Sequence, residues 1–329
     1  MNSSAAIPVI RSGFLAMGTW VTVSLAVAEA EQEPAAEAAI AEVRALIEQF
    51  GRDWWAWGDG ALARINRDLA AGETVRIPPA MRPLFSRAWA MREASDGLFE
   101  PRIAALVELW GFDEPAHLRS APPAPEEIAR RVADLRAAPG YDGAESYGPA
   151  PGVGWDFGGI GKGWIVDQAL DLLRSRGFAD AIVDAGGNLA ARGGRGLQPW
   201  RIGVRDPRGE DTTALLASLT VYDEAVNTHG DDQRYFEYQG RRYAHLLDAA
   251  TGTPVEGLRS LTVVHRDAVL AEAGGAAMYA AGPGRCAELA RGLGIAQFLV
   301  VDERGDVLAS PDLAGRLRPE PGIRLQVFS

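Results

Sequence analysis

The sequence predicts an α+β fold, because helix-like and strand-like segments follow one another in an irregular order. Apolar residues recur at helical spacing in 40–50, whereas they alternate with polar residues in 21–25. No internal repeat of about 20 to 50 residues is present, which argues against a solenoid or propeller. At 329 residues, 47% of them hydrophobic, the chain can bury a substantial core. We expect two lobes within one domain, residues 14–329, preceded by an N-terminal segment, residues 1–13.

The first strand is expected at 21–25, where Val21, Val23 and Leu25 alternate with Thr22 and Ser24. The surrounding stretch, 12–28, carries no charge and ends in small residues, so a signal peptide is the alternative interpretation. A single arginine precedes this stretch, which is a weak basic region for a signal peptide. We therefore expect a strand and a cytoplasmic protein, with export as the alternative if a longer precursor exists.

Helices are predicted where apolar residues share one face or where end signals occur. Ile40, Val43, Ile47 and Phe50 mark one helix after Pro34, and further helices are expected at 84–94, from Trp164 to a C′ glycine at Gly177, and at 268–281. The single cysteine, Cys286, lies in another helical segment. A lone cysteine cannot form an internal disulfide, and we expect this one to pack in the core.

Strands are predicted between and after these helices, at 181–183, 201–205, 215–221, 260–265 and 297–301. Segments 235–238 and 241–247 form a predicted hairpin, because Gly240 can adopt the positive φ of a tight turn. Runs of proline and glycine at 122–125 and 148–152 indicate loops.

Charge excludes one class of partner. The net charge is −11 and the isoelectric point is about 5.0, whereas binding to nucleic acid requires a basic stripe. We expect neither a nucleic-acid partner nor a membrane span.

The segment Asp156-Phe157-Gly158-Gly159-Ile160-Gly161-Lys162-Gly163-Trp164 is the most informative stretch, because four glycines surround one lysine before a predicted helix. Glycines let backbone N–H groups approach a phosphate, the helix N-terminus attracts anions, and the lysine adds a full charge. The P-loop pattern fails here, because it requires Ser or Thr where Gly163 stands. The dinucleotide-binding pattern fails as well, because its third glycine is not in register. From this loop alone, a diphosphate site and a plain strand-to-helix turn are about equally supported.

Further blocks resemble the FAD:protein FMN transferases, the ApbE-like flavin transferase family, in the family's order from about Phe14 to about Cys286. The blocks are Met17-Gly18-Thr19, Gly97-Leu98-Phe99-Glu100-Pro101 with Leu109-Trp110-Gly111-Phe112, the glycine loop, Asp184-Ala185-Gly186-Gly187-Asn188, and Ala244-His245-Leu246-Leu247-Asp248-Ala249-Ala250-Thr251-Gly252-Thr253-Pro254-Val255. The shared order is more specific than any single block. The resemblance implies a two-lobed mixed α/β domain with flavin in a cleft between the lobes.

The resemblance also implies a reaction. FAD is split at its pyrophosphate, FMN is attached through its phosphate to a threonine of an acceptor flavoprotein, and AMP leaves, with Mg²⁺ as the divalent metal. His245 is the implied general base, since imidazole exchanges protons near neutrality, and Asp248 of the same block is implied to be catalytic. Position alone would favour a structural role for His245.

The resemblance also implies which residues contact FAD. Met17 is expected against the isoalloxazine ring, and the remaining expected contacts are Trp57, Leu98, Phe99, Glu100, Asp156, Lys162, His229 and Leu246. Trp54 and Trp55 are alternatives to Trp57, and His229 stands where relatives usually carry serine.

The metal block departs from the family pattern. A carbonyl of the glycine loop, at Gly159, and side chains of an Ala-Asp-Ala-x-x-Thr block are the implied ligands, but this chain has Glu272 for the aspartate and Ala276 for the threonine. Magnesium commonly retains waters, so a missing hydroxyl weakens such a site without abolishing it. Glu100 and Ala249 also replace a family aspartate and proline. An FAD pyrophosphatase, or a weakly active FAD-binding protein, therefore stays an alternative to the transferase.

Overall fold

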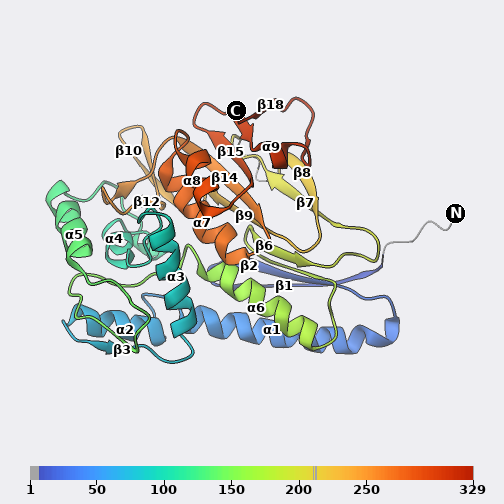
Figure 1. Cartoon of the computed structure of the whole chain (residues 1–329), viewed down its shortest axis with the longest axis horizontal. Coiled ribbons are helices and arrows are strands. Elements are labelled where there is room, and N and C mark those ends of the chain that lie inside the picture. Colours follow the sequence, from blue (N-terminus) through green and yellow to red (C-terminus); the bar gives the residue numbers. More distant parts are fainter. Residues whose placement is uncertain (1–6, 210, 212, 329) are drawn as a thin grey trace.

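The computed structural model describes residues 7–209, 211 and 213–328, and a nine-stranded sheet is its central element (Figure 1). The strand order is β1-β2-β5-β6-β9-β14-β15-β16-β18, and neighbours are antiparallel except β16 and β18. The strands span Val9–Ala16 (β1), Thr19–Ala26 (β2), Ala181–Ala185 (β5), Asn188–Arg192 (β6), Ala225–Gly230 (β9), Leu258–His265 (β14), Gln297–Asp302 (β15), Val307–Ala309 (β16) and Leu325–Val327 (β18).

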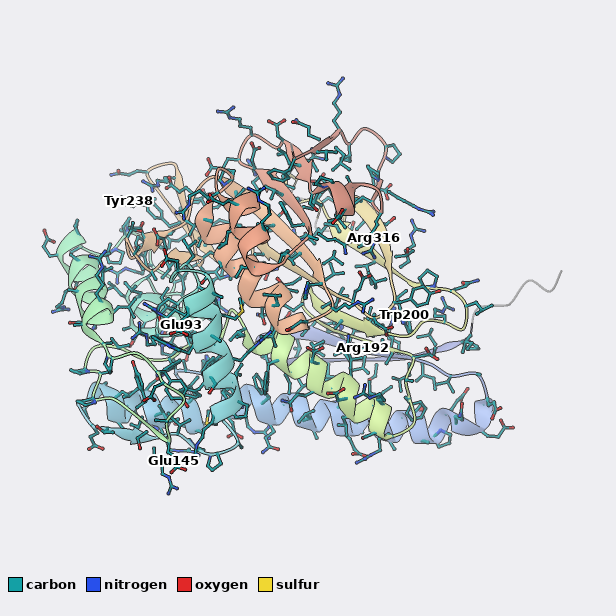
Figure 2. All side chains as sticks on the ribbon, in the orientation of Figure 1. Glu93, Glu145, Arg192, Trp200, Tyr238 and Arg316 are labelled. Atoms are coloured by element: carbon teal, nitrogen blue, oxygen red, sulfur yellow. The ribbon has the colours of Figure 1, made fainter. Side chains whose placement is uncertain are left out.

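Smaller sheets flank the central one. A three-stranded sheet consists of β17 (Arg318–Pro319), β8 (Leu215–Val221) and β7 (Trp200–Arg205). Two-stranded pairs are β3 (Val75–Arg76) with β4 (Ser146–Tyr147), β10 (Tyr235–Tyr238) with β11 (Arg241–Ala244), and β12 (Leu247–Asp248) with β13 (Thr253–Pro254). In Figure 2, Tyr238 marks the tip of the β10–β11 hairpin.

Four helices cover one face of the central sheet and share a core with it: α1 (Glu33–Asp53), α6 (Gly161–Ser175), α7 (Ala268–Ala281) and α8 (Cys286–Leu293). Val21, Val23 and Leu25 of β2 are fully buried in this core, which explains their alternation in the sequence. Arg192, labelled in Figure 2, forms an ion pair with Asp167 of α6 at 2.7 Å, which ties the helix to the end of β6.

A second core belongs to the region on the left of Figure 1, formed by α2 (Ala61–Ala70), α3 (Arg82–Ala94), α4 (Ala104–Leu109) and α5 (Pro125–Ala137). Its centre is aromatic: Phe85 lies with its ring centroid 4.6 Å from that of Trp155 and 5.0 Å from that of Phe157. Phe157 belongs to the glycine loop, so this core holds one end of the loop.

A third core, with Trp200, lies between the central sheet and the three-stranded sheet, next to α9 (Pro311–Ala314). Two short 3-10 helices, Ala30–Gln32 and Pro115–His117, complete the chain.

The mixed α+β prediction is confirmed, and so are the helices and strands named above, within a few residues at their ends. Three differences stand out. β1 was not predicted; it starts at Val9 and therefore lies partly in the expected N-terminal segment. Pro125, expected in a loop, opens α5, where its missing N–H costs nothing. The arm expected to run to residue 247 ends at Ala244, and His245 follows it outside any strand.

Cys286 is buried at the start of α8, as expected. Within the described ranges, no helix combines the length and hydropathy that crossing a bilayer demands.

Candidate active site

Two tight turns lie side by side at one end of the central sheet. Met17 and Gly18 join β1 to β2 with φ of 52° and 70°, the signs of a type I′ turn. Gly186 and Gly187 join β5 to β6 with φ of 67° and 89°. The turns touch, because a Cβ on Gly186 would lie only 2.0 Å from the Oγ1 atom of Thr19. A methionine at positive φ is unfavourable, and such strain is typical of functional positions.

The glycine loop connects the aromatic core to the N-terminus of α6. Three glycines of the loop already donate their N–H groups to acceptors within the protein: Gly158 to Asp156 Oδ1 at 2.9 Å, Gly161 to the Phe157 carbonyl at 2.7 Å, and Gly163 to Glu272 Oε2 at 2.7 Å. The carboxylate of Glu272 on α7 therefore lies at the N-terminus of α6, where an anion is favoured. Glycine at 163 is required sterically, because a Cβ there would lie 2.4 Å from the Ala268 carbonyl oxygen.

Glu272 is a buried carboxylate at the contact between α6 and α7. Its side chain is 1% exposed, and Lys162 Nζ lies 3.6 Å from its Oε1 atom. Burial raises the pKa of Glu272, while Lys162 and the Gly163 N–H act in the opposite direction. Lys162 also donates to the Gly158 carbonyl at 3.3 Å. Its ammonium thus lies between a carboxylate and a carbonyl of the loop.

His229 of β9 packs against the same turn of α7. Its Nε2 atom lies 2.9 Å from the Glu272 carbonyl oxygen, which can only accept, so Nε2 carries the proton. A Cβ on Gly275 would lie 2.9 Å from the same ring, so a small residue is needed there. Burial lowers the pKa of His229 to about 4, and the positive charge of Lys162 acts in the same direction.

His245 is held by the backbone of Arg234, across the base of the β10–β11 hairpin. Its backbone N–H donates to the Arg234 carbonyl at 3.0 Å, and its Nδ1 atom lies 3.3 Å from the same oxygen. Nδ1 therefore carries the proton, and the lone pair is on Nε2. Burial lowers the pKa of His245 to about 4, helped by the positive charges of Arg234 and Lys162. The ring is neutral near pH 7 and can accept a proton.

Both predicted aspartates have local hydrogen-bond partners. Asp248 accepts from the Ala250 N–H at 2.8 Å and from the Thr251 hydroxyl at 3.0 Å, which closes the turn between β12 and β13. Burial raises the pKa of Asp156, against the opposing effect of the Gly158 N–H and of Lys162. The charge of Lys162 thus acts on Asp156, whereas Asp248 has a turn-forming role and its catalytic role stays a prediction.

Glu100 is held by two arginines. It accepts from Arg102 Nε and Nη2, each at 2.8 Å, and from Arg92 Nε at 2.7 Å, with its side chain 3% exposed. Burial alone would raise the pKa of Glu100, but these hydrogen bonds outweigh burial and lower it. The carboxylate is occupied by this clamp, so its contact with flavin stays a prediction.

The remaining expected contacts line the two cores. Phe99 is buried next to the glycine loop, since a Cβ on Gly159 would lie 3.3 Å from its ring and 3.8 Å from Ala276 Cβ. This places the two implied metal positions, 159 and 276, beside one another. Leu98, Trp54 and Trp57 pack partly buried against the aromatic core, Trp55 is 41% exposed, and Leu246 packs partly buried against the core of the central sheet.

Arg234 is a further residue of the candidate active site, and the sequence alone does not indicate it. Its carbonyl orients His245, its guanidinium donates to the Phe112 carbonyl, and its charge acts on both His245 and Asp156. Its role depends on hairpin pairing, which brings residues 234 and 245 together.

The chain is similar to known proteins over most of its length. Residues 17–299 match the model of the ApbE family. The chain is 30% identical over 326 residues to the FAD:protein FMN transferase of Rhodobacter capsulatus, covering 97% of this chain but only 60% of that relative. It is 32% identical over 318 residues to the enzyme of the same name from Treponema pallidum, covering 87% of this chain and 84% of the relative.

The crystal structure of the ApbE protein of Thermotoga maritima superposes with a TM-score of 0.83 at 30% identity, covering 94% of this chain and 99% of the other. The family model covers residues 17–299, most of the chain, and the fold superposes on a solved ApbE structure, so this chain belongs to the ApbE family.

Proposed function

We propose that this protein is an FAD:protein FMN transferase that splits FAD and attaches FMN, through its phosphate, to a threonine of an acceptor flavoprotein. The observation that carries the proposal is the pair of Lys162 and Glu272 at the glycine loop of an ApbE-family chain, with the charge of Lys162 acting on a neutral His245. A base and a mobile cation beside one loop are the parts that phosphoryl transfer to a hydroxyl needs.

In this proposal the flavin lies in a cleft between the two lobes, with its ring against Met17 and Phe99. The buried Phe99 and the strained Met17 turn are the features that support this placement. The diphosphate lies at Lys162 and the accessible edge of the loop. It does not take the Gly163 N–H, because Glu272 already accepts that hydrogen bond.

Magnesium fits the oxygen donors on this side of the loop. Glu272 provides a buried carboxylate, and Gly159, which lies beside Ala276, would provide a backbone carbonyl, whereas Ala276 offers no side-chain oxygen. Among the described residues, no three His, Cys, Asp or Glu side chains form a metal-binding group, so water and substrate oxygens would have to complete the shell. When bound, the metal would neutralise charge on the diphosphate.

The chain's own residues supply the proton transfer. The acceptor threonine Oγ forms a bond to the phosphorus of the FMN half, the bond from that phosphorus to the bridging oxygen breaks, and AMP leaves with that oxygen. His245 Nε2 takes the threonine proton, and its Nδ1–H bond to the Arg234 carbonyl keeps Nε2 free for this role. The resulting imidazolium can return its proton to solvent after AMP has left.

Transfer and hydrolysis can be separated in one assay. The protein is incubated with FAD, Mg²⁺ and an acceptor flavoprotein domain, with the acceptor Thr-to-Val variant as the matched control. We expect flavin fluorescence that survives denaturing electrophoresis, on the threonine acceptor alone. Free FMN and AMP without labelled protein would identify an FAD pyrophosphatase, and FAD binding without AMP release would identify a flavin-binding protein.

A further inference from the structure

Lys162 is the only lysine among the 33 lysine and arginine residues of this chain. Every other basic side chain is a guanidinium, which is planar and forked, whereas an ammonium is a compact point charge with rotatable donors. The chain therefore places its single compact side-chain cation at the glycine loop.

The surroundings of this ammonium resemble a cation-binding site. Lys162 Nζ lies 3.6 Å from the Glu272 carboxylate and 3.3 Å from the Gly158 carbonyl oxygen. The donor types are those proposed for the metal: Glu272 again, and a carbonyl of the same glycine pair. The Glu272 carboxylate is 1% exposed, whereas the Lys162 side chain is 29% exposed and reaches solvent.

We propose that, in the ligand-free protein, the Lys162 ammonium lies where a metal ion would bind beside the Glu272 carboxylate. A divalent metal ion and Lys162 then compete for this carboxylate. A buried carboxylate is costly without a cation beside it, so the lysine stabilises Glu272 until metal arrives. Two cations sharing one carboxylate repel each other. Metal binding therefore drives the ammonium toward the accessible edge of the loop, where the FAD diphosphate lies. This inference rests on the proposed function, because it assumes that Glu272 is a metal ligand.

The test measures Mn²⁺ binding to the FAD-free protein by calorimetry. Lys162→Met keeps the unbranched stem of the side chain and removes the competing ammonium, so we expect Mn²⁺ to bind about ten-fold more tightly. Arg174→Met is the matched control, because it removes one positive charge from the exposed end of the same helix. We expect no change there, and we expect Glu272→Gln to abolish Mn²⁺ binding.

The outcomes distinguish the two ideas. An unchanged or weaker Mn²⁺ affinity in Lys162→Met, with binding still lost in Glu272→Gln, overturns the competition and leaves the transferase proposal intact. Unchanged binding in Glu272→Gln removes the carboxylate from the metal site and overturns the competition along with the proposed metal ligand. Transfer of FMN to the acceptor is scored separately, so it still tests the function.

A second measurement needs no substitution. Reductive methylation with ¹³C-formaldehyde labels the amines of the chain, which are Lys162 and the N-terminal amine. We expect Mg²⁺ alone to shift the Lys162 dimethylamine resonance while the N-terminal signal stays in place as the internal control. A Lys162 signal that does not move when calorimetry shows Mg²⁺ bound to the same methylated protein would overturn the proposal.

Discussion

The acid limb of the pH–rate profile tests the role of His245 most sharply. An unperturbed histidine, with a pKa of about 6.5, would lose half of its base form at pH 6.5. Burial lowers the pKa of His245 to about 4, so about 99% of the ring is neutral at the same pH. The base form is present above the pKa and lost below it. We therefore expect kcat/KM for FAD to stay nearly constant from pH 8 to about pH 5.5 and to fall only as the pH approaches about 4.

The assay is AMP release in the presence of acceptor and saturating Mg²⁺, with circular dichroism at each pH to confirm that the protein stays folded. His245→Gln keeps a side chain of similar polarity but cannot take the proton, and should lower kcat by about 10² to 10⁴-fold with little change in the FAD dissociation constant. A midpoint near pH 6.5 would refute the claim that His245 is held neutral. Loss of FAD binding in parallel with rate would show that His245 positions the ligand and is not the base.

Two further substitutions test assignments made above. Glu100→Ala should destabilise the protein by about 3 to 5 kcal/mol in urea unfolding, because it leaves the buried Arg102 without its carboxylate, whereas Glu93→Ala on the exposed surface should change stability by less than about 0.5 kcal/mol. A cost below about 1 kcal/mol for the first variant would contradict the clamp. Ala276→Thr adds an oxygen beside Gly159 and should lower the Mg²⁺ dissociation constant several-fold in calorimetry, with Ala280→Thr as the control one turn further along α7. An unchanged constant would place residue 276 outside the metal site.

The parts of the fold that could be predicted are those with a local cause. Gly240 indicated the β10–β11 turn because that turn needs positive φ, and residues 21–25 alternate because one face of β2 is buried. The sequence of β1 lacks such alternation, since this strand lies at the edge of the sheet and few of its side chains are buried. Its pairing with β2 decides its structure.

In the candidate site as well, local motifs could be predicted from the sequence, whereas contacts between distant segments could not. The glycine loop and His245 are recognisable as motifs, but the partners that other segments bring to them, Glu272 and Arg234, are not. The glycine loop predicts a phosphate site, but the sequence does not indicate that the N–H of Gly163 donates to Glu272 of α7. The resemblance implies a flavin contact for Glu100, yet the carboxylate pairs with Arg102 in its own loop and with Arg92 of α3.

The central claim is that one reaction both cleaves FAD and labels a protein. The most direct measurement is the ratio of AMP released, by chromatography, to flavin bound covalently to the acceptor, by intact mass spectrometry, in the same reaction. The account predicts one AMP for each acceptor molecule labelled at threonine, with both products lost in His245→Gln. AMP released in excess over labelled acceptor, or labelled acceptor without AMP, would contradict it.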